Sequence, residues 1–74
     1  METYVDVYIN SDGGKASHVF DKLTGFGLKH HLGEHDFIYD WKGVVDISEE
    51  IQFIDKLQAE LRGTGVMLKF TTKR

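Results

Sequence analysis

The sequence predicts an α+β fold in which two helices cover one face of a four-stranded antiparallel sheet. Four segments alternate apolar and polar residues with the period of two that a half-buried strand requires. Two others repeat apolar residues every three or four positions, which is the spacing of one helical face. Along the chain these segments follow the order strand, helix, strand, strand, helix, strand, and this order predicts the two-layer arrangement.

Residues 36–42 form the expected third strand, around which the sheet is arranged. Phe37, Tyr39 and Trp41 face one way in such a strand, because successive side chains point to opposite faces. We expect these three rings to lie beneath the helices. The even-numbered side chains of the segment, including Ile38, then lie on the open face of the sheet.

Residues 3–9 predict the first strand, which has one apolar and one amphipathic face. The face expected in the core carries Val5, Val7 and Ile9. The opposite face carries Tyr4, Asp6 and Tyr8. The two tyrosines are therefore expected on the open face of the sheet.

The first helix is expected after the glycine-containing break at residues 10–14. Ser11 or Asp12 is its expected cap, because a short polar side chain can accept a hydrogen bond from the free amides of the first turn. Gly25 is its expected end, since glycine readily adopts a positive φ. Its apolar face consists of Ala16, Val19, Phe20 and Leu23.

Residues 26–32 predict the second strand, which a short bridge joins to the third as a hairpin. An even register places His35 and Phe37 on the same face as Leu28, whereas an odd register would match Leu28 with Asp36, Ile38 and Asp40. The apolar pattern therefore favours the even register.

The second helix is expected to begin at Asp46, because Glu49 three residues later completes a capping-box pattern. The apolar stripe of this helix consists of Ile47, Ile51, Ile54, Leu57 and Leu61, of which the last four are expected in the core. Residues 66–71 predict the fourth strand, whose core-facing side chains are Val66, Leu68 and Phe70.

This order of elements is the split βαβ pattern of the ferredoxin-like fold. Its two crossovers are right-handed, so both helices lie on one face of the sheet and the first and third strands lie in the middle. With 74 residues, of which 41% are hydrophobic, residues 1–74 predict a single domain with a small core. The chain has no cysteine, so an apolar core, extended by self-association, must stabilise it.

Charge and hydropathy argue against several classes of function. A net charge of -3 disfavours nucleic acid as a partner, because binding to a phosphate backbone depends on clustered lysine and arginine. The amino terminus has no signal-peptide pattern, and no segment is long and apolar enough to cross a bilayer. We therefore expect a cytoplasmic protein without a membrane partner.

The open face of the sheet is the first candidate surface. Tyr4, Tyr8, Ile38 and Met67 share it in the expected register and can form an apolar island, which on a small protein often marks a contact surface. We expect a homodimer or another protein–protein contact, formed through this face or through an edge strand. An ordinary half-solvated sheet face is the alternative interpretation.

The histidines near the hairpin do not predict a metal site. His30 and His31 point to opposite faces of a strand, so at most one of them can join His35, and a metal needs three or four converging ligands. His31 lies opposite Asp36 in the even register, and protonation of His31 would strengthen that pair. We expect no metal, no cofactor and no catalytic residue, since no nucleophile lies beside a base in the expected geometry.

The loop formed by Ser11, Asp12, Gly13 and Gly14 is the second candidate site. Its glycines permit close approach of a ligand to the backbone, and the free amides at the start of a helix attract an anion. A capped turn is the alternative reason for such a loop.

Residues 12–16, followed by Val19, Phe20 and Leu23, are similar to the equivalent loop and helix of ACT domains, which are regulatory ferredoxin-like modules that bind amino acids at dimer interfaces. The proline that usually precedes the glycine in that family is absent here. The resemblance implies a small-molecule ligand at the 11–14 loop. A ligand-sensing module is therefore the alternative to an association module.

Residues 34–41 and 61–66 also resemble small archaeal proteins of similar length, a group that brings no established activity with it. RNA binding is a further alternative, because RNA-recognition domains share this element order and stack bases on aromatic residues of the first and third strands. Here the aromatic residues of the third strand share a face with the core, which disfavours RNA. The sequence therefore predicts a noncatalytic association module of ferredoxin-like fold.

Overall fold

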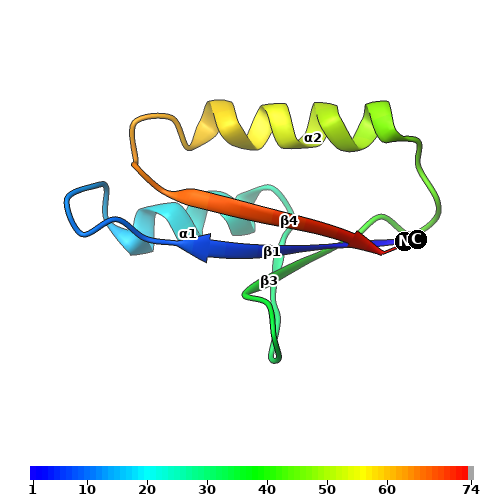
Figure 1. Ribbon diagram of the computed structural model, residues 1–74, viewed down its shortest axis with the longest axis horizontal. Helices are drawn as coiled ribbons and strands as arrows, with labels where there is room; N and C mark the ends of the chain where they lie inside the picture. Colours follow the sequence, from blue (N-terminus) through cyan, green and yellow to red (C-terminus); the bar gives the residue numbers. More distant parts are fainter. Residues whose placement is uncertain (74) are drawn as a thin grey trace.

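The structure, a computed structural model that describes residues 1–73, has the predicted order of strands and helices (Figure 1). In chain order its elements are β1 (Glu2–Tyr8), α1 (Ala16–Gly25), β2 (Lys29–His30), β3 (Phe37–Asp40), α2 (Ile47–Glu60) and β4 (Met67–Lys73). The sheet is antiparallel with the order β2-β3-β1-β4, so β1 and β3 are central as predicted. This is the ferredoxin-like sandwich.

The predicted orientation of the β3 aromatic residues is confirmed. Phe37 pairs with Val5 across β1 and β3, and both side chains are fully buried. Beyond Phe37, the ring of Tyr39 lies 4.4 Å and that of Trp41 lies 5.1 Å from the ring of Phe53 on α2, measured between centroids. The rings of β3 and of the residue after it therefore lie on the helical side of the sheet.

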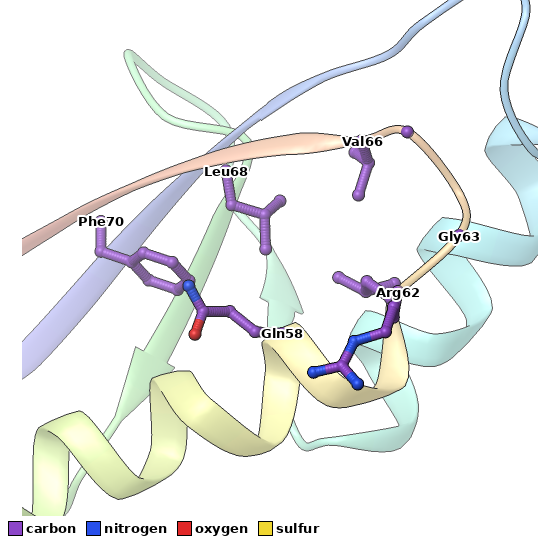
Figure 2. A pocket seen from close by; sticks show the side chains of 8 residues that line it. Gln58, Arg62, Gly63, Val66, Leu68 and Phe70 are labelled. Carbon is purple, nitrogen blue, oxygen red and sulfur yellow. The ribbon is translucent and has the colours of Figure 1, made fainter.

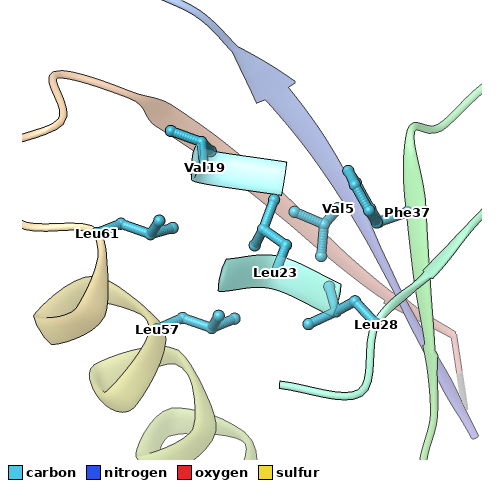
Figure 3. Close-up of a cluster of buried hydrophobic side chains, with 7 residues drawn as sticks. All are labelled: Val5, Val19, Leu23, Leu28, Phe37, Leu57 and Leu61. Carbon is cyan, nitrogen blue, oxygen red and sulfur yellow. The ribbon is translucent and has the colours of Figure 1, made fainter. Parts of the chain in front are cut away.

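The buried core joins both helices to this face of the sheet (Figure 3). Val19 and Leu23 contribute from α1, Leu57 contributes from α2, and Leu61 follows directly after α2. The complete buried apolar set is Val5, Val19, Leu23, Leu28, Phe37, Leu57 and Leu61. The core is therefore small, and a second layer of half-buried rings surrounds it.

The start of α2 follows the sequence prediction. Asp46 is the N-cap, and its carboxylate accepts hydrogen bonds from the Glu49 amide at 3.0 Å and from the Ser48 hydroxyl at 2.9 Å. These bonds satisfy an amide that the helix itself leaves without an acceptor.

The rotation of α2 about its axis differs from the prediction. Ile51 was expected in the core, but 51% of Ile51 is exposed, and Ile47 in the same apolar stripe is 62% exposed. The helix instead turns Glu50 and Phe53 toward the sheet. The ring of Phe53 packs there against the ring of Tyr39 on β3. The apolar stripe of this helix is thus only partly buried.

The ends of α1 and β1 also differ from the prediction. The N-cap of α1 is Lys15, which makes no side-chain capping bond, so neither Ser11 nor Asp12 caps the helix. Ile9 is exposed, because β1 ends at Tyr8. Ile9 therefore lies outside the core in which it was expected.

The second strand is shorter than residues 26–32. α1 ends at Gly25 as predicted, but the amide of Phe26 donates to the carbonyls of Lys22 and Leu23 and the amide of Gly27 donates to Thr24, so these two residues close the helix and do not begin the strand. The positive φ of 93° occurs at Gly27 and not at Gly25. Only Lys29–His30 remains to pair with β3, in the predicted even register.

Neither helix among residues 1–73 is long and apolar enough to span a bilayer.

Replacing the N-cap by Asp46→Ala should lower the free energy of unfolding by about 1 kcal/mol, because the Glu49 amide loses its acceptor. Urea unfolding followed by circular dichroism measures the change. Asp55→Ala, at an exposed position within the same helix, is the matched control and should change stability by less than about 0.5 kcal/mol. Equal effects of the two substitutions would contradict the capping role.

Candidate association surface

The four residues predicted as an interface lie on the open face of the sheet but do not form one patch. Tyr4 is opposite Ile38, and both are half-buried. Tyr8 is opposite Met67 at the far end of β1, where 57% of Tyr8 and 70% of Met67 are exposed. Asp6 lies between the two pairs on β1. The expected apolar island is therefore interrupted by a charged residue.

His35 lies on this open face, although the sequence placed it with the core. Its Nδ1 atom lies 3.0 Å from a carboxylate oxygen of Asp6, and its ring lies 4.9 Å from that of Tyr4. The cause lies at the neighbouring Asp36, whose carboxylate accepts a hydrogen bond from the Val7 amide at 2.8 Å. A side chain replaces the backbone acceptor there, so β3 begins only at Phe37 and the hairpin tip before it turns toward the open face.

His31 pairs with Asp36 through the backbone, since its amide donates to the Asp36 carbonyl at 3.0 Å. This agrees with the predicted register. Its ring, however, contacts Tyr4 edge-on at 5.3 Å, while the Asp36 carboxylate is bound to the Val7 amide. A contribution of the His31–Asp36 pair to pH-dependent stability stays a prediction.

Tyr4 is surrounded by partners of its own chain. Its hydroxyl donates to the Glu2 carboxylate at 3.2 Å, and the Lys73 ammonium lies 5.1 Å from the centre of its ring. The pKa of Tyr4 is raised above its ordinary value, first because burial disfavours the phenolate and also because the Glu2 carboxylate is close. The centre of the open face is therefore occupied by internal contacts.

The structure places no metal-binding cluster on this face or elsewhere in residues 1–73, since no three histidine or carboxylate side chains converge there.

The loop of Ser11, Asp12, Gly13 and Gly14 packs against the turn after α2. The Gly14 amide donates to the Thr64 carbonyl at 2.8 Å, and the Gly13 amide donates to the Asn10 carbonyl at 3.0 Å. The Asp12 amide donates to the Asn10 side chain at 3.0 Å. Three amides of the predicted ligand site therefore already have acceptors within the protein, and ligand binding there stays a prediction.

The longest free backbone edge of the described sheet belongs to β4. The sheet ends with β2 on one side and β4 on the other, but β2 has two residues and β4 has seven. A strand edge of this length presents unpaired amides and carbonyls that can pair with another strand.

Two hydrogen bonds show which β4 residues face this edge. The Val7 amide donates to Asp36 and the Trp41 amide donates to the Met1 carbonyl, so odd-numbered residues of β1 bond toward β3. Alternate residues of an antiparallel strand bond to opposite neighbours, so the even-numbered residues of β1 bond toward β4. Their register partners are Met67, Lys69, Thr71 and Lys73. The backbone groups of Leu68, Phe70 and Thr72 therefore point outward.

A groove of about 470 Å³ runs between α2 and β4 beside this edge (Figure 2). Its apolar walls are formed by Leu61, Val66, Leu68 and Phe70. Gln58 and Arg62 complete it from the helical side, and neither side chain has a hydrogen bond or ion pair with another residue in 1–73. The groove therefore combines an apolar wall with polar groups that lack a protein partner.

The exposed isoleucines of α2 lie on the same side of the helix as the groove. Ile47, Ile51 and Gln58 follow one another at intervals of four and seven residues, which keeps them on one side of α2, and Arg62 lines the groove from the turn after the helix. We call the combined feature the edge surface: it consists of the outward edge of β4 together with Ile47, Ile51, Gln58, Arg62, Leu68 and Phe70. The interface prediction from sequence named none of these residues.

One signal in the sequence does indicate the edge surface. The stripe of Ile47, Ile51, Ile54, Leu57 and Leu61 is broad, and Phe53 adds to it on the other side. A helix that covers a sheet on one side can bury only part of such a stripe. The remainder must be exposed or covered by a partner.

Comparisons of the chain with protein-family models, with curated proteins and with solved structures found no match. The geometry of the chain itself is therefore the basis for any proposal about its function.

Replacing Gly13 by alanine should destabilise the protein, because the new methyl group would overlap the Thr64 carbonyl oxygen. A loss of about 1–3 kcal/mol in the free energy of unfolding is expected. Gly25→Ala, where an added methyl group meets no atom within 4 Å, should leave stability unchanged or raise it by up to about 1 kcal/mol. Thermal unfolding of both variants measures this difference, and a fully stable Gly13→Ala protein would contradict the packed loop.

Proposed function

We propose that this protein is a noncatalytic association module that binds a partner by strand addition along β4. The observation that carries the proposal is the edge surface, where a seven-residue free edge lies beside a groove and an exposed apolar helix side. In strand addition the backbone hydrogen bonds supply affinity and a neighbouring groove accepts side chains.

The sequence of β4 leaves this edge open. Natural edge strands are commonly protected by proline, by a bulge or by lysines. The chain contains no proline, and β4 pairs with β1 without interruption over seven residues. Lys69 and Lys73 lie on the face that carries Tyr4 and Asp6, away from the groove. The β4 side chains on the helical side of the edge, Leu68 and Phe70, are therefore apolar, and Arg62 brings a charge to the groove from the turn after α2.

The alternatives have weaker support. A ligand-sensing role like that of ACT domains requires binding at residues 11–14, where the amides of Asp12, Gly13 and Gly14 already donate within the chain. RNA binding requires an attractive open face, but Glu2 and Asp6 lie on it along the central strand β1. A cytoplasmic location and a relationship to archaeal proteins stay predictions from the sequence.

An added strand should protect selected amides of β4. In protein dilute enough that the β4 edge is unpaired, we expect a synthetic peptide with the sequence of residues 67–73 to shift the resonances of Leu68, Phe70 and Thr72 in the ¹⁵N-labelled protein and to slow exchange of their amide protons. Lys69 and Thr71 are internal controls, because their amides bond toward β1 already.

The matched control is the same peptide with N-methyl groups on the three amides that would face β4. It keeps the side chains but cannot complete the ladder, so it should leave the three resonances unchanged. Equal effects of both peptides would refute strand addition.

A further inference from the structure

We infer that the partner at the edge surface is a second copy of the same chain, joined through an antiparallel β4–β4 pair whose twofold axis passes through Phe70. The inference rests on the proposed function, since it names the partner for the same edge. It follows from three properties of β4 and α2, which are the outward set of backbone groups, the positions of two lysines and the exposed side of α2.

The first property limits the register. Two strands that meet at their free edges must match outward residues with outward residues, because only these have amides and carbonyls available. In β4 the outward residues are Leu68, Phe70 and Thr72. An axis at Phe70 pairs Leu68 with the partner's Thr72 and each Phe70 with the other, so all three take part. An axis at Lys69 or Thr71 engages only two of them within residues 67–73.

The second property selects the same register on electrostatic grounds. An axis at Lys69 places Lys69 directly opposite the partner's Lys69. An axis at Thr71 places Lys69 opposite the partner's Lys73. Like charges directly across a strand pair are destabilising. The axis at Phe70 instead places Lys69 opposite the partner's Thr71 and Lys73 opposite the partner's Met67. Within each subunit Asp6 and Glu2 are the β1 partners of the two lysines.

The third property explains the exposed isoleucines. α2 runs along β4 on the helical side of the sheet (Figure 1). A twofold axis beside β4 brings the two copies of α2 next to each other, with the side that carries Ile47, Ile51, Gln58 and Arg62 turned toward the partner. The half-exposed isoleucines and the groove then become part of one interface. Each subunit of the dimer buries more apolar surface than the isolated subunit does.

Cysteine cross-linking tests the register directly, because the chain has no cysteine of its own. Residue 69 and the partner's residue 71 would form a directly opposed pair that is not hydrogen-bonded across the interface, with Cα atoms about 4.5 Å apart, a distance that a disulfide can span. Two copies of residue 69 would lie diagonally, about 7–8 Å apart. A mixture of Lys69→Cys and Thr71→Cys proteins should therefore form the mixed disulfide under mild oxidation, and each variant alone should not cross-link.

Ile51→Lys tests the helical half of the interface without removing a residue on which the fold depends, since 51% of Ile51 is exposed. Sedimentation equilibrium should show a wild-type dimer and an Ile51→Lys dimer that is weakened by about tenfold or more. Gln52→Lys, which adds the same charge one position along α2 on another side of the helix, is the control and should dimerise as the wild type does.

A strictly monomeric wild-type protein at millimolar concentration, or cross-linking of Lys69→Cys with itself, would overturn the inference. Its failure can be separated from failure of the proposed function. If the protein is monomeric but the peptide of residues 67–73 still protects Leu68, Phe70 and Thr72, the edge binds a strand and only the identity of the partner is wrong. If neither occurs, both proposals fail.

Discussion

The contact between Phe37 and Val5 determines the arrangement of the whole sheet. These two side chains are fully buried opposite each other on the central strands. Because side chains alternate along a strand, their burial also decides that Tyr39 faces the helices and that Tyr4 and Ile38 face the other way. A shift of one residue would exchange the two faces. The position of the free edge on β4 follows from the same constraint, since β1 can bond only to β3 on one side and β4 on the other.

Much of this arrangement could be predicted from the sequence because it depends on periodicity. The alternation in β1, β3 and β4, the capping residue Asp46 and the even hairpin register are all confirmed. The rotation of α2 could not be predicted in the same way. The helix contains more apolar residues than it buries. Which of them are buried depends on how Phe53 packs against the rings of Tyr39 and Trp41. That packing is a tertiary contact, which the spacing of residues in one helix does not specify.

The position of His35 and the role of the 11–14 loop depend on single polar contacts and were therefore outside the reach of pattern analysis. Asp36, the residue before β3, offers its carboxylate to the Val7 amide, and the hairpin tip turns toward Tyr4. Gly13 and Gly14 allow a close approach to Thr64, which lies far along the chain in the turn after α2. In both cases the local residue types are compatible with several conformations. Contacts with residues far away in the sequence, Val7 in the first case and Thr64 in the second, select one of them. The glycines of the candidate ligand loop therefore also serve packing against the turn after α2.

The edge surface differs from these features because nothing within the fold requires it. Ile47 and Ile51 contribute little to the core as it stands, and a polar residue at either position would cost the isolated domain little apolar burial. The outward backbone groups of Leu68, Phe70 and Thr72 would likewise be satisfied by water. Two features on adjacent elements therefore have no partner within the described fold. One is the free backbone edge of β4, and the other is the exposed apolar side of α2. A single partner strand with an apolar helix above it, which is what a second copy of this chain presents, would satisfy both at once.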